Sequence, residues 1–188
     1  MNRGRRLRHR VQYLLDPRVD RYVLEEVVLP ALAARDEVND VLFVGCDWYT
    51  RRYHERWAPL HVQTIDLDPE KASYGSPDHI QGSVTELDHH LGAETIDAVV
   101  LSGVIGFGLD RAEDCEAAIE QCRKVLRPGG WLVIGWNDVD DLRTAAPESL
   151  RALAAFDPTP LPPFPHPRYP TFSPARHTFD FYRRRAEG

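Results

Sequence analysis

Residues 41–68 read VLFVGCDWYTRRYHERWAPLHVQTIDLD, and they hold the most informative pattern in the chain. An apolar run ends at Gly45, a helix-like segment follows, and a second apolar run ends at Asp66. Glycine lets the backbone turn sharply and approach a ligand closely. An acid about 20 residues further along the chain can accept hydrogen bonds from ribose hydroxyls. The stretch therefore predicts a nucleoside site at the edge of a parallel sheet.

The glycine loop of this stretch departs from the usual signature. A G-x-G-x-x-G or G-C-G-x-G pattern would carry further glycines, but the chain continues from Gly45 with Cys46, Asp47, Trp48 and Tyr49. Much of the functional question therefore depends on what these four side chains do in the loop.

The size and composition of the chain predict one soluble domain. Its 188 residues are 43% hydrophobic and 28% charged, which suits a globular protein with a full core. The chain has no run of about 18 apolar residues, so we expect no membrane-spanning helix. Three scattered cysteines predict neither a disulfide framework nor a zinc site. We therefore expect a cytoplasmic protein with reduced thiols, no metal and no membrane partner.

The formal net charge of −6 argues against a general nucleic-acid binder. The first ten residues nevertheless hold five arginines and a histidine, an arm that could contact RNA or an acidic substrate. A solvated chain terminus is the favoured interpretation. Nucleic acid is thus disfavoured as a partner, and a homodimer stays open.

Apolar runs and helical patterns alternate along the chain. Strands are predicted at 41–45, 61–68, 79–83, 96–103 and 131–136, and helices at 18–35, 49–57 and 111–126. Asp16 and Pro17 are expected to begin the first helix, which Pro30 should kink or divide. The alternation predicts an α/β fold with a Rossmann-like, doubly wound and mostly parallel sheet.

The pattern weakens after Asp138. Residues 142–156 could form one broken helix. The eight prolines of residues 157–174 indicate an extended, partly polyproline segment, either a loop over the site or a strap across the sheet. The alternation in HTFDFYRRR, residues 177–185, predicts a last strand that inserts antiparallel.

Five motifs resemble those of the class I S-adenosylmethionine-dependent methyltransferases: VLFVGC, TIDLDPEKA, HIQGSVTEL, IDAVVLSGVI and KVLRPGGWLVIGW. The last is the most specific, and the order and spacing of all five matter more than any one. The resemblance covers residues 38–138 and the last strand. We expect a single methyltransferase-like domain over 1–188, with a basic arm and helix at 1–37, a cofactor-binding core at 38–138, and a Pro-rich segment with the last strand at 139–188.

The resemblance implies S-adenosylmethionine as the cofactor and places its ribose and methionine parts. Gly45 and Cys46 would pack under the methionine part. Asp66 would bind the ribose hydroxyls, and Leu67 would lie against the adenine.

Contacts to the adenine and to the sulfonium are implied further along the chain. Ser83 stands where the family often has an aspartate that accepts a hydrogen bond from the adenine amino group, and a serine accepts it more weakly. Val84 would offer a backbone N–H to the adenine ring. Ser102 and Gly103 would flank the sulfonium at the carboxyl end of the fourth strand.

One departure from the family suggests a compensation. The family usually has an acid two residues before the first glycine, where this chain has Phe43. Asp47, two residues after that glycine, could replace it as the partner of the cofactor's ammonium group. Alternatively, Asp47 caps a helix that begins near Tyr49. The two roles are compatible, and both stay open.

Candidates for acceptor binding lie beside the same sheet edge. Asn137 and Asp138 follow the fifth strand, where they could orient or deprotonate an acceptor, although Asp138 could instead cap a helix. Aromatic walls would suit a flat or apolar small molecule. The aromatic residues expected near the site are Tyr13, Trp48, Tyr49, Phe107 and Trp136. No catalytic residue is assigned, because methyl transfer from a sulfonium needs no universal base. Each of the eight histidines is expected to be structural or exposed.

The sequence therefore predicts a methyltransferase that acts on a small-molecule acceptor in a biosynthetic tailoring step. The altered glycine loop leaves open a catalytically inactive protein that binds S-adenosylmethionine. The basic arm leaves open an RNA-directed methyltransferase.

Overall fold

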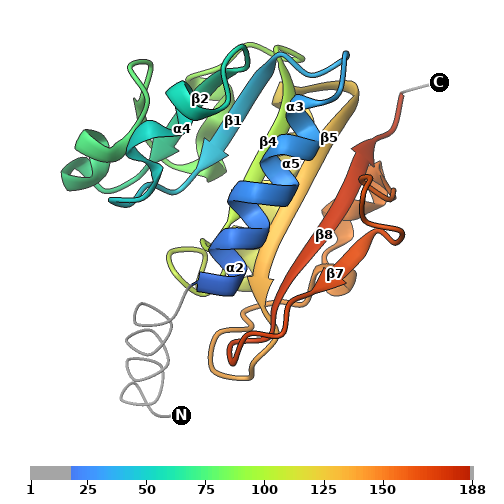
Figure 1. The fold of residues 1–188 in the computed structure, drawn as a ribbon. Coiled ribbons are helices and arrows are strands. Elements are labelled where there is room, and N and C mark those ends of the chain that lie inside the picture. The colour runs from blue at the N-terminus through green and yellow to red at the C-terminus, as the bar shows by residue number, and fades with distance from the viewer. Residues whose placement is uncertain (1–17, 187–188) are drawn as a thin grey trace.

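The apolar runs of the sequence form the centre of one eight-stranded sheet in the computed structural model, which describes residues 18–186 (Figure 1). The strand order is β3-β2-β1-β4-β5-β8-β6, and β7 also pairs with β8. Strands β1 to β5 run parallel, whereas β8 runs antiparallel to β5, β6 and β7. The predicted Rossmann-like α/β sheet with an antiparallel C-terminal strand is confirmed.

The strands are β1 (Asp40–Val44), β2 (His61–Asp66), β3 (Ile80–Gln81), β4 (Ile96–Ser102), β5 (Leu126–Asn137), β6 (Phe156–Pro158), β7 (Arg168–Pro170) and β8 (His177–Arg184). The α-helices are α2 (Arg18–Val23), α3 (Leu29–Ala33), α4 (Tyr53–Arg56) and α5 (Ala112–Val125). A π-helix, η1 (Leu24–Val28), joins α2 to α3. The 3₁₀ helices are η2 (Thr50–Arg52), η3 (Pro69–Tyr74), η4 (Val84–His89), η5 (Pro147–Ser149) and η6 (Arg151–Ala155).

Both faces of the sheet are covered, because successive side chains of a strand point to opposite faces. Leu42 and Val44 of β1 belong to the core cluster that includes α5. Val41 and Phe43 belong to the second cluster, with the N-terminal helical segment and α4. Figure 1 shows this N-terminal segment, α2 and α3, lying along the sheet. The two clusters explain why the central strands read as continuous apolar runs.

The N-terminal helical segment is divided near Pro30, as its sequence predicts. The π turn η1 ends at Val28, and Pro30 occupies the first turn of α3. Proline has no N–H to donate, so a regular α-helix cannot pass through this point unchanged. Asp16 and Pro17, expected to start the helix, lie outside the described residues.

The segment after β5 differs from its prediction. Instead of one broken α-helix over 142–156, it forms the short 3₁₀ helices η5 and η6. The Glu116 carboxylate on α5 accepts hydrogen bonds from the backbone N–H groups of Arg151 and Ala152, both at 2.8 Å. The Glu116 side chain therefore accepts from two backbone donors at the start of η6 and holds η6 against α5.

The Pro-rich segment runs beside β8 as two short strands. β6 pairs with the end of β8, and β7 pairs with its beginning. Pro158 and Pro170 end these strands, a position at a sheet edge where the missing N–H of proline is tolerated. Two short parts of the segment are therefore extended and belong to the sheet, whereas turns and bends lie between and after them.

Asp97 joins the beginnings of three neighbouring strands. Its buried carboxylate accepts hydrogen bonds from the backbone N–H groups of Asn39 and Asp40, both at 2.9 Å. It also forms an ion pair with Arg127 of β5. The amino ends of β1, β4 and β5 are thereby held in register, on the edge opposite the predicted site.

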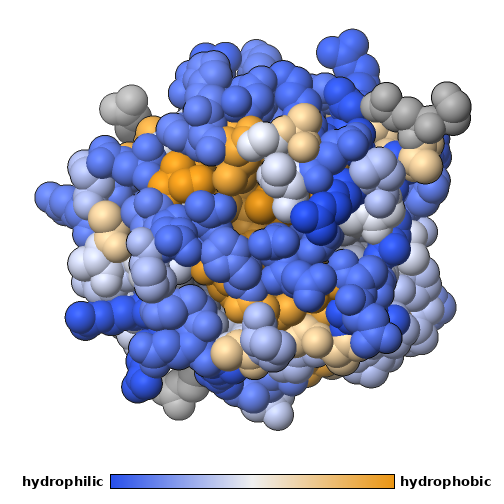
Figure 2. All heavy atoms as spheres, turned by 90° about the horizontal axis from the view of Figure 1, so that it is seen from above, coloured by the Kyte–Doolittle hydropathy of each residue, from blue (hydrophilic) through white to orange (hydrophobic). Residues whose placement is uncertain are grey.

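The surface agrees with a globular domain. Figure 2 shows the face that points upward in Figure 1; hydrophilic side chains cover most of it, with hydrophobic ones visible in small areas between them. Within residues 18–186, each helix is too short or too polar to span a membrane.

Candidate functional site

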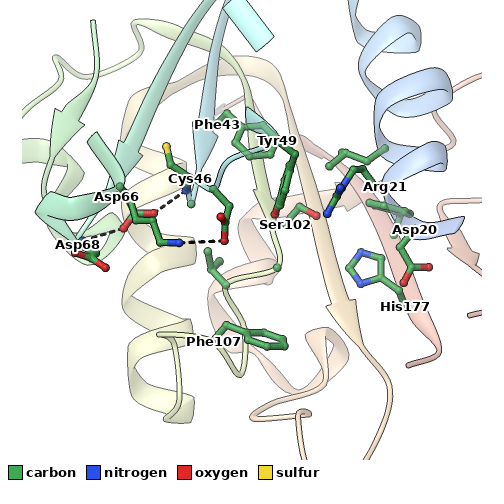
Figure 3. A pocket seen from close by; sticks show the side chains of 17 residues that line it. Asp20, Arg21, Phe43, Cys46, Tyr49, Asp66, Asp68, Ser102, Phe107 and His177 are labelled. Carbon is green, nitrogen blue, oxygen red and sulfur yellow. Dashed lines mark hydrogen bonds and ion pairs between the residues drawn. The ribbon is translucent and has the colours of Figure 1, made fainter. Parts of the chain in front are cut away.

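A cavity opens where the strand order changes direction, between the carboxyl ends of β1 and β4. Its volume is about 390 Å³. Open α/β sheets bind ligands at this point, since the connections from the two strands leave toward opposite faces. The walls come from both strand ends, from the N-terminal helix and from β8 (Figure 3).

The floor of the cavity is the turn at Gly45. Its φ angle is +88°, and a Cβ atom there would lie 2.9 Å from Val104 Cγ1. The Gly45 N–H donates to the Ile65 carbonyl at 2.9 Å, which ties the turn to β2. The position therefore requires glycine for both its backbone conformation and its space.

Asp66 joins the two loops on one side of the cavity. One carboxylate oxygen accepts from the Cys46 N–H at 2.6 Å, and the other accepts from the Asp68 N–H at 2.8 Å. Each carboxylate oxygen has a further acceptor site. Because Asp66 lines the cavity, its carboxylate is positioned to accept from a ligand diol.

Asp47 lines the same side but does not cap the helix that follows. Its carboxylate accepts from the Trp48 N–H at 2.7 Å and from Lys71 Nζ at 3.0 Å, and η2 begins without a side-chain cap. Burial acts to lower the pKa of Lys71, but the hydrogen bond and charge of Asp47 outweigh it and raise that pKa. The capping role considered for Asp47 is therefore replaced by an ion pair.

Tyr49 and Trp48 differ in their relation to the cavity. Tyr49 lines it, and burial raises the pKa of its phenol to about 12. Trp48 is 62% exposed and lies outside the lining, with its ring 5.7 Å from that of Tyr49 in an edge-to-face contact. The two aromatic residues in the loop therefore leave the cavity open.

Most residues on the other side of the cavity were not assigned from the sequence. They are Asp20 and Arg21 from α2, and His177 and Phe179 from β8. The expected aromatic residue Phe107, from the loop after β4, lines the cavity with them. Figure 3 shows Asp20, Arg21 and His177 across Tyr49 from Asp66 and Asp68. These segments are far apart in the sequence, so no local motif connects them.

His177 is held by Asn137 at the paired ends of β5 and β8. The His177 ring nitrogen Nδ1 lies 2.8 Å from Asn137 Oδ1, and the two residues are direct partners in the antiparallel register. Burial lowers the pKa of His177 to about 3, so the imidazole is neutral near pH 7. A Cβ atom at Gly135 would lie 2.8 Å from His177 Nε2 and 2.5 Å from Ser102 Oγ. The glycine therefore makes room for both side chains.

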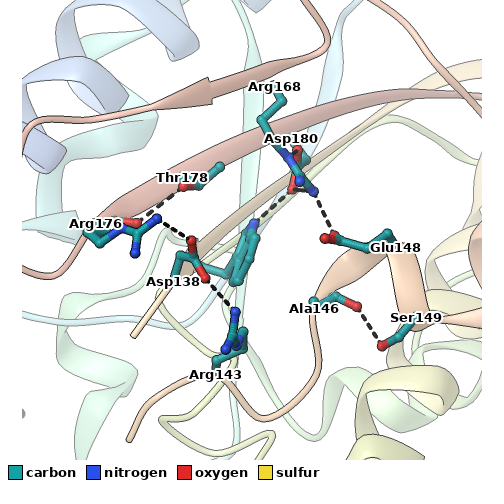
Figure 4. Close-up of polar contacts among 10 residues, drawn as sticks. Asp138, Arg143, Ala146, Glu148, Ser149, Arg168, Arg176, Thr178 and Asp180 are labelled. Atoms are coloured by element: carbon teal, nitrogen blue, oxygen red, sulfur yellow. Dashed lines mark hydrogen bonds and ion pairs between the residues drawn. The ribbon is translucent and has the colours of Figure 1, made fainter. Parts of the chain in front are cut away.

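Trp136 and Asp138 have structural contacts instead of the acceptor contacts expected for them. Trp136 is 3% exposed and donates from Nε1 to Asp180 at 2.8 Å. Asp138 forms ion pairs with Arg143 and Arg176, at 2.8 and 2.9 Å (Figure 4), and caps no helix. Neither residue lines the cavity. In a strand, Trp136 must face opposite to Gly135 and Asn137, which turns it into the core beside α5.

The remaining predicted residues divide into two groups. Gly45, Cys46, Asp47, Tyr49, Asp66, Ser102 and Gly103 line the cavity together. Leu67, Ser83 and Val84 do not: Leu67 is 70% exposed, Ser83 accepts from the Thr85 N–H at the start of η4, and the Val84 side chain is buried in the core. Tyr13 lies outside the described residues.

Comparisons with known proteins agree with this geometry. A family model described as a methyltransferase domain matches residues 42–134. A search of curated proteins found no match. Among solved structures, the N-methyltransferase NodS from Bradyrhizobium japonicum WM9 is 19% identical, with a TM-score of 0.63 over 85% of this chain and 93% of that chain.

Two further solved structures share the fold. A TehB-like SAM-dependent methyltransferase from Corynebacterium glutamicum is 15% identical, with a TM-score of 0.62 over 98% of this chain and 100% of that chain. The 1,6-didemethyltoxoflavin-N1-methyltransferase from Burkholderia thailandensis is 19% identical, with a TM-score of 0.57 over 97% of this chain and 89% of that chain.

Proposed function

Since the chain belongs to the class I S-adenosylmethionine-dependent methyltransferase family, we propose that it methylates a small-molecule acceptor bound in the cavity beside β1 and β4. The family and the cofactor predicted from the five motifs are confirmed. The observation that carries the acceptor proposal is the composition of the cavity, which has a carboxylate side and an aromatic side.

The carboxylate side fits the nucleoside half of the cofactor. Gly45 keeps the floor free of a side chain, and Asp66 is fixed with acceptor capacity left for ribose hydroxyls. Asp47 adds a carboxylate near the turn, which supports the proposed contact to the ammonium group, although it already pairs with Lys71. When bound, the cofactor supplies a methyl group activated by a positively charged sulfur.

The aromatic side fits an acceptor of limited size. Phe43, Tyr49, Phe107 and Phe179 supply apolar walls, and His177 adds a neutral imidazole. Such walls exclude water and hold an acceptor in line with the methyl group, which is the main contribution a protein makes to this chemistry. One solved structure of the same fold is named for a didemethyltoxoflavin substrate, but at 19% identity only the fold is shared.

The proposal is tested by binding and by transfer. Calorimetry should show binding of S-adenosylmethionine and of S-adenosylhomocysteine to the wild-type protein. Incubation with methyl-labelled cofactor and a panel of small amines, phenols, heterocycles and carboxylic acids should place label in the small-molecule fraction. Bulk RNA and denatured protein serve as comparison substrates. Label found in RNA alone, or a protein that binds cofactor and labels nothing in the panel, would contradict the proposal.

A further inference from the structure

Arg21 reaches the cavity from α2 and lies over two aromatic rings. Its guanidinium carbon is 4.0 Å from the ring centroid of Tyr49 and 4.7 Å from that of Trp48. Cation–π contacts of this kind hold the plane of a guanidinium in place. Trp48 and Tyr49 belong to the altered glycine loop, so part of the departure from the usual signature forms a platform for Arg21.

Arg21 differs from the other arginines that lie over aromatic rings in residues 18–186. Arg183, over Trp131, pairs with Glu37 at 3.0 Å. Two more stacked arginines also have carboxylate partners: Arg56 pairs with Glu25 and Glu26, and Arg168 with Asp180 and Glu148. In the described part of the chain, Arg21 alone of these four has no ion pair.

Each carboxylate close to Arg21 in sequence accepts a hydrogen bond from another residue. Glu25, one turn further along, accepts from the Tyr53 hydroxyl and from Arg56, both at 2.9 Å. Asp20 accepts from the Thr171 hydroxyl. The contacts of Glu25 also fasten the N-terminal helical segment to α4, which fixes the helix that carries Arg21. The guanidinium is thus presented to the cavity by a helical segment that is tied to α4.

From this arrangement we propose that Arg21 is a carboxylate-binding residue of the cavity, positioned by Trp48 and Tyr49. A guanidinium stacked through its faces still presents N–H donors along its edge, and these match a carboxylate in a bidentate pair. An unpaired cation would also repel a positively charged sulfur in the same cavity. An anionic group beside Arg21 removes that cost.

The proposal rests on the proposed function, since it takes this cavity as the site of methyl transfer. The carboxylate has two sources with the same chemistry. It is either the carboxylate of the cofactor's methionine part or a carboxylate on the acceptor. Arg21 lies across Tyr49 from Asp66 (Figure 3), a position compatible with both, so the experiment has one arm for each source.

The first arm measures cofactor binding by calorimetry in the wild-type protein and in Arg21→Gln. The probes are S-adenosylhomocysteine and its decarboxylated analogue. If Arg21 binds the cofactor's carboxylate, the wild-type protein prefers S-adenosylhomocysteine by about 10- to 100-fold, the usual contribution of a charged hydrogen-bonded pair. Arg21→Gln then loses most of this preference, and Arg21→Lys retains part of it.

The second arm compares benzoate with benzamide, with S-adenosylhomocysteine saturating and again without it. If the acceptor supplies the carboxylate, wild-type protein prefers benzoate about 10-fold or more. Arg21→Gln removes that preference and leaves the affinity for S-adenosylhomocysteine unchanged. Because this arm also runs without cofactor, a failure of cofactor binding and a failure of Arg21 give different results.

Two further variants separate recognition from folding. Arg183→Gln removes a stacked arginine outside the cavity lining, and both preferences should stay as in wild type. Trp48→Ala removes an exposed ring of the platform, and we expect the Arg21-dependent preference to fall by about threefold to tenfold with the melting temperature unchanged. The proposal is overturned if wild type prefers the carboxylate in neither arm, or if Arg21→Gln matches wild type in both.

Discussion

The carboxylate of Asp66 accepts a hydrogen bond from the backbone N–H of Cys46 at 2.6 Å, across the ends of β2 and β1. One side chain therefore fixes the glycine loop and faces the cavity at the same time. Its second oxygen accepts from the Asp68 N–H, so the orientation of the carboxylate is set before any ligand binds. A preorganised acceptor of this kind loses little entropy when a ribose diol arrives.

The first prediction concerns Asp66. Asp66→Ala should weaken binding of S-adenosylhomocysteine by about 10- to 100-fold, because a charged acceptor is lost from the ligand and from the loop. Asp66→Asn, which keeps one acceptor oxygen, should lose less. Calorimetry measures both affinities. Asp78 is an exposed carboxylate outside the cavity lining, so the control variant Asp78→Asn should bind S-adenosylhomocysteine as the wild type does. An unchanged affinity in Asp66→Ala would refute the role assigned to Asp66.

The second prediction concerns the turn at Gly45. Gly45→Ala combines a positive φ with a contact of 2.9 Å to Val104, so it should lower the free energy of unfolding by about 2–4 kcal/mol. Gly103→Ala has the same backbone strain, φ +75°, but its Cβ meets no atom within 4 Å. It should cost only about 1–2 kcal/mol. Urea unfolding compares the two, and equal losses would show that the Val104 contact contributes nothing.

The sequence predicts the Asp66 side of the site well because its determinants are local. A strand, a glycine turn and an acid after the next strand occur within residues 41–68, and their pattern alone brings Gly45 close to Asp66. The Arg21 side is different. Arg21 reaches the cavity only because the N-terminal segment packs on the sheet, and His177 only because β8 inserts beside β5.

The differences between the expected and the observed contacts have the same origin. Trp136 and Asn137 are neighbours in sequence, but the alternation of a strand sends one into the core and the other toward His177. Which of the two faces the site depends on register, and register depends on pairing with β8. Likewise, the Asp47 carboxylate pairs with Lys71 instead of capping a helix. Lys71 approaches from the segment after β2, so this partner is not local in sequence.

The third prediction tests the opposite edge of the sheet. Asp97→Ala leaves the N–H groups of Asn39 and Asp40 without their acceptor and removes the shorter of the two ion pairs of Arg127. We expect a loss of about 2–4 kcal/mol in the free energy of unfolding, with cofactor affinity retained in the folded fraction. Asp157→Ala removes an exposed ion pair with Arg185 and should cost under about 1 kcal/mol. Chemical denaturation with calorimetry distinguishes the two, and similar losses would contradict the role of Asp97.

The last prediction follows from the buried imidazole of His177. Burial lowers its pKa to about 3 in the folded protein, whereas the unfolded chain binds a proton near pH 6.5. Between these values the unfolded state holds more protons, so stability must fall as the pH falls from about 6.5 toward 3. His177→Gln removes this group and should flatten that part of the stability curve. His166→Gln, at an exposed position, should leave it unchanged. Melting temperatures measured every half unit of pH test this, and an unaltered slope in His177→Gln would show that other groups cause the acid sensitivity.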